Sequence, residues 1–139
     1  MRRGLRSCAP ARVAWESGGM SQKTSLDALA REQLELASGA GGGRTAHTVY
    51  GGHEKVLRQT LIAMVGGAEL SEHENPGEAT MLVLHGRVRM SAGALAWDGS
   101  RGDLITVPDA RHRLEALEDC DVLLTVAMRE AADPAGRAT

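Results

Sequence analysis

The chain has 139 residues, of which 42% are apolar and 24% charged, and its formal net charge is -2. This length suits one domain, and the composition is that of a folded globular protein rather than a disordered one. The charge, together with two Trp, one Tyr and no Phe, offers neither the basic footprint nor the stacking platforms that nucleic acid requires. No apolar run approaches the roughly 20 residues of a membrane-spanning helix, and two cysteines are too few for a disulfide scaffold. We therefore expect neither nucleic-acid nor membrane partners. The Ala-, Gly- and Arg-rich composition resembles that of a bacterial protein, so we expect a cytoplasmic location.

Residues 1–23 are basic, because four arginines and one lysine face a single glutamate there. A secretory signal would continue into an unbroken apolar stretch, but Pro10 and Arg12 interrupt it. We interpret residues 1–23 as a disordered N-terminal extension. The alternatives are an amphipathic transit peptide, or an upstream addition to a chain that starts at Met20.

The segment Ser25–Ala37 is predicted to be a helix, with Thr24 or Ser25 as its N-cap. Apolar residues recur in it at steps of three and four, namely Leu26, Leu29, Ala30, Leu34 and Ala37. The glycine-rich run that follows is typical of a linker, so residues 24–43 form a helix-and-linker unit. A helix this short is marginal alone and needs a surface to cover, either on the following domain or on a second subunit.

Residues 44–128 change to short β-rich runs separated by turn dipeptides such as Gly51-Gly52 and Pro108-Asp109. Regular short strands of this kind indicate an all-β sandwich or barrel, and residues 129–139 are expected to form a loose tail. The predicted strands are His47–Tyr50, Val56–Val65, Ala68–Glu74, Ala79–Leu84, Arg87–Ala92, Leu95–Asp98, Leu104–Val107, His112–Leu117 and Val122–Ala127.

Two segments of this β-rich region carry a family resemblance. The run GAELSEHENPGEATMLVLHG at residues 67–86 resembles the first cupin motif, G-x5-H-x-H-x3,4-E-x6-G, and GDLITVPDARH at residues 102–112 resembles the second, G-x5-P-x-G-x2-H. The resemblance spans roughly residues 44–128, most of the folded chain, and implies a double-stranded β-helix, the jelly-roll barrel, with a pocket at its mouth. In cupins with the full pattern, three histidines and one glutamate hold a divalent metal.

The match to the ligand positions of the motifs is incomplete. His73 and His112 occupy the first and last histidine positions, whereas Asn75 stands at the second and Ala79 at the glutamate position. Glu78 is one residue away and falls on the opposite face of a strand, unless a bulge after the Pro-Gly turn rotates it inward. The ligand set is therefore degenerate.

Two functions follow from this pattern, with no catalytic residue assigned in either. The first is binding of a small organic molecule at the barrel mouth by His73, Asn75, Met81 and His112, with or without a weakly held divalent metal. The second is a metal-dependent oxygenase, isomerase or cyclase acting on a small carbonyl or phenolic substrate. Its metal, Fe, Mn, Zn or Ni, would be held by His73, Glu78 and His112. The position of Glu78 distinguishes the two functions, because a metal site needs that carboxylate inside the barrel.

Three further expectations concern residues outside the motif positions. A homodimer is expected, since small cupins often pair and the helix needs a surface. His85 lies in the turn before Gly86 and receives no role. Cys120 is expected to be either a small apolar filler or a partly exposed thiol, with no neighbouring pattern that would activate it.

Overall fold

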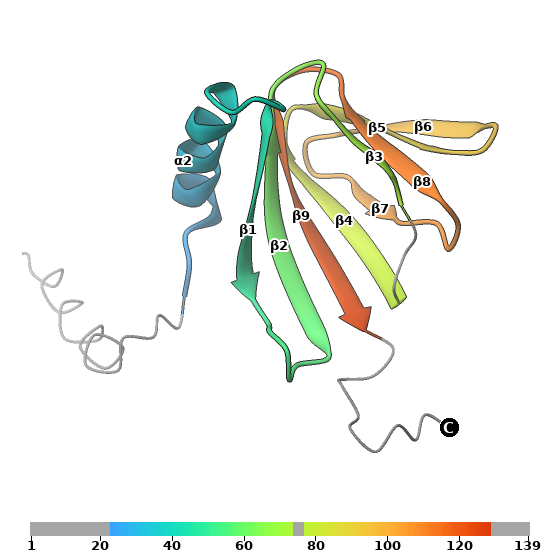
Figure 1. Ribbon diagram of the computed structural model, residues 1–139, viewed down its shortest axis with the longest axis horizontal. Coiled ribbons are helices and arrows are strands. Elements are labelled where there is room, and N and C mark those ends of the chain that lie inside the picture. The colour runs from blue at the N-terminus through green and yellow to red at the C-terminus, as the bar shows by residue number, and fades with distance from the viewer. Residues whose placement is uncertain (1–22, 74–76, 129–139) are drawn as a thin grey trace, which may run out of the picture.

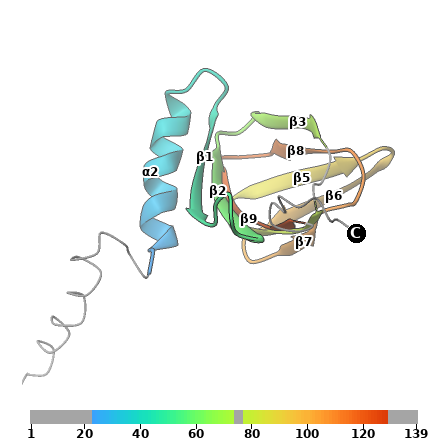
Figure 2. The same ribbon diagram turned by 60° about the horizontal axis from the view of Figure 1, so that its bottom comes forward.

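The computed structural model describes residues 23–73 and 77–128, which form two antiparallel β-sheets and a helix (Figure 1). The two sheets face each other and enclose an apolar core, which is the predicted jelly-roll arrangement (Figure 2). The five-stranded sheet has the order β1 (Arg44–Tyr50), β2 (Leu57–Met64), β9 (Cys120–Met128), β4 (Gly77–His85) and β7 (Leu104–Thr106). The four-stranded sheet has the order β3 (Glu69–His73), β8 (His112–Ala116), β5 (Arg87–Ala92) and β6 (Leu95–Ser100).

All nine predicted strands are present, and the differences concern their ends. The largest is at β1, which begins at Arg44, three residues before the predicted start. Arg44 pairs with Met64 and Thr45 with Ala63, so backbone pairing to β2 extends the strand through residues that carry no apolar pattern. Pairing with β2 therefore extends β1 through residues whose sequence does not itself predict a strand.

Alternate residues of the strands point into the core. The register between β2 and β9 runs without a shift from Leu57↔Ala127 to Met64↔Cys120, and β4 pairs with β9 without a shift from Gly77 to Val83. Directly opposite residues of an antiparallel pair share one face, so Ile62, Val122 and Val83 form one buried row across three strands. The same pairing decides which side chains of these strands face the barrel interior.

The helix α2 (Leu26–Ser38) covers the outer face of β1 and β2 (Figure 2). Ser25 is its N-cap and accepts a hydrogen bond from the Ala28 amide at 3.2 Å, as one of the two predicted caps. The helix residues Ala30, Gln33 and Ala37 are buried. On β2, Leu61 and Ala63 are fully buried although they point away from the barrel interior. The helix therefore finds its required surface on its own barrel. No helix in the described part of the chain is long and apolar enough to cross a membrane.

Candidate functional site at the barrel mouth

Five strand ends meet at one end of the barrel, which we call the barrel mouth: the starts of β2, β4 and β8 and the ends of β3 and β9 (Figure 1). β3 follows β2 through a tight turn, in which the Ala68 amide donates to the Val65 carbonyl at 3.0 Å, and so runs back toward the mouth. Pairing of Gly77 with Met128 and of Leu57 with Ala127 brings the other strand ends to the same level.

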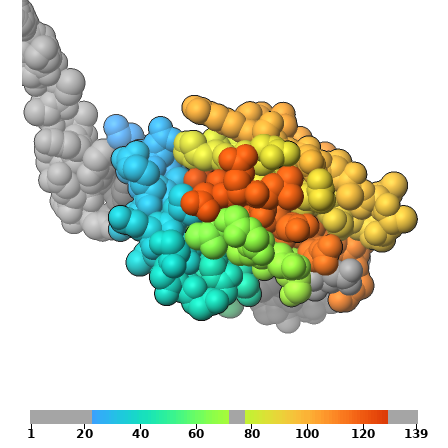
Figure 3. Space-filling view, turned by 90° about the horizontal axis from the view of Figure 1, so that it is seen from above, coloured from blue at the N-terminus to red at the C-terminus, as the bar shows by residue number. Residues whose placement is uncertain are grey.

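The opposite end of the barrel is closed by turns. The Gly66 amide donates to the Asp119 carboxylate at 2.9 Å, which joins the β2–β3 turn to the β8–β9 turn. Seen from above in Figure 3, these two turns and the β4–β5 turn lie side by side over this end. We therefore place the candidate ligand site at the barrel mouth.

His112 begins β8 at the barrel mouth and is 5% exposed. Its Nδ1 lies 2.8 Å from the Ala110 carbonyl oxygen. A carbonyl oxygen only accepts, so Nδ1 carries the proton, and Nε2 is the acceptor of the neutral ring. Backbone pairing places His73 directly opposite His112, after a register shift between Leu70 and His73. The first and last histidine positions of the two motifs are thus cross-strand partners.

The glutamate position of the first motif is apolar and lies inside the barrel. Ala79 is 8% exposed and belongs to the core, while the neighbouring Glu78 is exposed on the outer face of β4. Because the pairing of β4 with β9 has no shift between Gly77 and Val83, no bulge rotates Glu78 inward. A metal inside the barrel would need its carboxylate from elsewhere. Asn75 lies outside the described residues.

Met81 is 4% exposed and lies one row deeper than Ala79. It pairs with Leu124 on β9 and with Ile105 on β7, both of which pack in the same core. The thioether therefore forms part of the apolar floor beneath the barrel mouth, where methionine adapts readily to a neighbour's shape.

Arg58 is an interior residue that the sequence analysis missed. It lies opposite Val126, and Val126 lies opposite Ala79, so the three form one row on the inner face of the five-stranded sheet. Arg58 is half-buried, whereas Val126 is 7% exposed. The alternation along β2 could not show this face, because its last four residues, Leu61–Met64, are all buried.

Comparisons with known proteins find matches among solved structures. No protein-family model matches the sequence, and no curated protein matches it. A cupin superfamily protein from Desulfitobacterium hafniense is similar with a TM-score of 0.57 and 19% identity, covering 68% of this chain and 89% of that one. The chain has the cupin fold.

Two other solved structures are similar to this chain. A conserved protein of unknown function from Streptococcus pyogenes has a TM-score of 0.59 and 25% identity, over 66% of this chain and 80% of that chain. Salicylate 1,2-dioxygenase from Pseudoaminobacter salicylatoxidans, solved with gentisate, has a TM-score of 0.61 and 19% identity. The match covers 73% of this chain but 31% of the dioxygenase, so it concerns the cupin fold alone.

The described residues do not fit the metal site that the motifs imply. The described residues contain no group of three or more His, Cys, Asp or Glu side chains able to hold a metal ion. Inside the barrel, the carboxylate position is Ala79, and an alanine has no donor atom to offer. We therefore derive no metal-dependent step for this protein.

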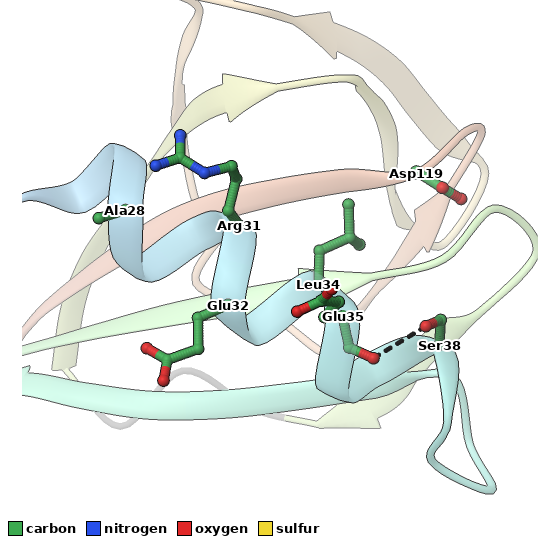
Figure 4. Close-up of a pocket in the computed structure, with 7 residues that line it drawn as sticks. All are labelled: Ala28, Arg31, Glu32, Leu34, Glu35, Ser38 and Asp119. Atoms are coloured by element: carbon green, nitrogen blue, oxygen red, sulfur yellow. Dashed lines mark hydrogen bonds between the residues drawn. The ribbon is translucent and has the colours of Figure 1, made fainter.

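A groove of about 570 Å³ lies outside the cupin barrel, at the end opposite the barrel mouth (Figure 4). It runs between α2 and Asp119 of the β8–β9 turn, and Arg31 and Leu34 project beside it. Ser38 Oγ donates to the Glu35 carbonyl at 2.8 Å within the helix. The lining mixes acidic, basic and small residues of one helix face, and nothing in it converges on a ligand.

Proposed function

We propose that this cupin binds a small organic molecule at the barrel mouth, with His112 as its central polar contact. The observation that carries the proposal is a buried imidazole with one nitrogen anchored on the Ala110 carbonyl. Burying a polar ring is costly unless its hydrogen bonds are made. An anchored ring at the open end of a barrel suits the recognition of a ligand.

His112 Nδ1 donates to the Ala110 carbonyl, and His112 has at least one further interaction. We propose that the ligand contacts this fixed ring. His73, its cross-strand partner, and Asn75 are proposed as further contacts. Met81 contributes the apolar floor. Small-molecule sites commonly combine such an apolar lining with a few placed polar groups.

The alternative, a metal-dependent enzyme, has less support. Its motif-derived carboxylate, Glu78, is exposed on the outer face, and Ala79 occupies the interior position. The likeness to salicylate 1,2-dioxygenase is one of fold, and one fold hosts many activities. We accordingly propose that binding does not depend on a metal.

The test is a thermal-shift screen of the full chain against substituted phenols, hydroxy acids and short aliphatic acids and alcohols. A binding compound is expected to raise the Tm of the wild type and of His53→Gln, an exposed control histidine, but not of His112→Gln. If His112→Gln responds as the wild type does, or if no compound shifts the Tm, the proposed site is wrong.

Metal content, measured by mass spectrometry on protein purified without chelator, tests the alternative. We expect far less than one metal ion per chain and no change in Tm with EDTA. Near-stoichiometric metal that disappears in a His73→Ala/His112→Ala variant would instead establish the metal-dependent enzyme.

A further inference from the structure

We propose that Arg58 makes the barrel mouth a site for small organic carboxylates. This inference rests on the proposed function and deepens it, because it names the chemical class of the ligand. On the inner face of the five-stranded sheet, Arg58 lies in the same row as Ala79, which stands at the glutamate position of the first motif.

The register places Arg58 on the interior face at the barrel mouth. β2 pairs with β9 from end to end without a shift, so Arg58 shares the face of the buried Ile62 and Met64. Its partner Val126 is opposite Ala79. Residues 58 and 79 are therefore two strands apart, about 10 Å between backbones, with a valine side chain between them.

The guanidinium of Arg58 makes no hydrogen bond or ion pair to any residue of the described chain. Arginines on the outer face of the other sheet differ in this. There, Arg89 Nε lies 2.8 Å from Asp98 Oδ1, and Arg113 Nη1 lies 3.7 Å from Glu69 Oε1. Arg58 as a whole residue is half-buried. Within the described residues, its guanidinium charge is therefore not neutralised by a paired carboxylate.

Ala79, at the glutamate position of the first motif, brings no negative charge to the row of Arg58. A glutamate there would stand in the same row as Arg58 and bring a negative charge to the inner face. With alanine, the row has one cation and a small side chain. The planar guanidinium matches a carboxylate with two parallel hydrogen bonds.

The test compares acids with their amides, which have the same shape but no charge. We would measure Kd by isothermal titration of the full chain with benzoate, salicylate, phenylacetate and succinate, each beside its amide. The wild type is expected to bind at least one acid about tenfold or more tighter than the amide, and less tightly at high salt. Arg58→Gln should lose this preference, and Arg58→Lys should keep part of it.

Arg44→Gln is the matched control, because Arg44 pairs with Met64 on the same face of the sheet but at the far end of β2, and is exposed. It should bind the acid as the wild type does. Circular dichroism and Tm would verify that each variant is folded.

The outcomes separate this inference from the proposed function. Equal binding of acid and amide by the wild type, or an unchanged preference in Arg58→Gln, overturns the carboxylate inference. Binding that still depends on His112 then leaves the proposed function standing. If no acid and no amide binds at millimolar concentration, both proposals are overturned.

Discussion

His85 Nδ1 lies 2.7 Å from Asp121 Oδ1, across β4 and β9 and beneath the edge of α2. Its other ring nitrogen, Nε2, lies 3.5 Å from Asp27 Oδ1 in the first turn of the helix. The imidazole thus links a carboxylate of the sheet, 3% exposed at Asp121, to one of the helix. The sequence analysis assigned His85 to no functional site, and these contacts give it a structural role.

Removing the His85 ring should destabilise the protein. His85→Ala leaves the buried Asp121 carboxylate without its donor, at an expected cost of about 1–3 kcal/mol in the free energy of unfolding. Urea unfolding at pH 7 would measure this loss. His53→Ala, at an exposed turn histidine, should cost less than about 0.5 kcal/mol. Equal small losses in both variants would contradict a stabilising role for the His85–Asp121 pair.

The charge of Asp121 should make stability depend on pH. Burial raises the pKa of Asp121 above its usual value, and the hydrogen bond and charge of His85 offset this in part. A carboxyl group with a raised folded-state pKa favours folding below its ordinary pKa, and loses that contribution as pH rises through the folded value. Asp121→Asn should therefore be at least as stable as the wild type at pH 7. That difference should disappear toward pH 4, and a clear loss of Tm at pH 7 would contradict it.

Gly86, the last glycine of the first motif, should not tolerate a side chain. It adopts a φ of +81°, and a Cβ there would lie 2.2 Å from the Asp119 carbonyl oxygen and 2.6 Å from Cys120 Cβ. Gly86→Ala is expected to cost several times more than Gly93→Ala. Gly93 has a φ of +61° and nothing within 4 Å of its Cβ position, so only the backbone penalty of about 1–2 kcal/mol applies there. Denaturant unfolding of both variants would show the contrast.

Cys120 should be unreactive in the folded protein. The side chain is 1% exposed, and burial, with smaller contributions from Asp121, Asp119 and Glu118, raises the pKa of its thiol to about 12. A Cys8→Ser variant leaves Cys120 as the sole cysteine of the chain. At pH 8 we expect iodoacetamide to label it only after unfolding in urea, as counted by mass spectrometry. Rapid labelling of the native variant would show that this part of the core opens.

A glutamate at position 79 should compete with an acidic ligand. Ala79→Glu brings a carboxylate to the row of Arg58 on the inner face, and we expect it to weaken binding of the preferred acid about tenfold. Glu78→Ala, on the outer face, is the matched control and should leave binding unchanged. Isothermal titration measures both, and the reverse pattern would mean that the assigned faces of β4 are exchanged.

Local patterns in the sequence predicted the elements well. The Ser25 cap and the apolar steps of the following residues predicted α2 to within a residue at each end. The β5 boundaries, Arg87–Ala92, were exact because the strand alternates polar and apolar residues between two turns. Of the two alternatives for Cys120, the structure supports the buried one. Dimerisation and the location in the cell stay predictions.

The sequence by itself determined the strands, the helix and the cupin resemblance, since these depend on short-range alternation, turn residues and motif spacing. Only the tertiary structure decided which face each side chain occupies and which distant residues meet. The face of Arg58 depends on pairing with β9, because the last four residues of β2 are all buried and show no alternation. The pairing of His85 with Asp121, 36 residues apart, depends on the register of β4 with β9. Such contacts are set by sheet register and burial, for which the neighbouring residues in the chain provide no signal.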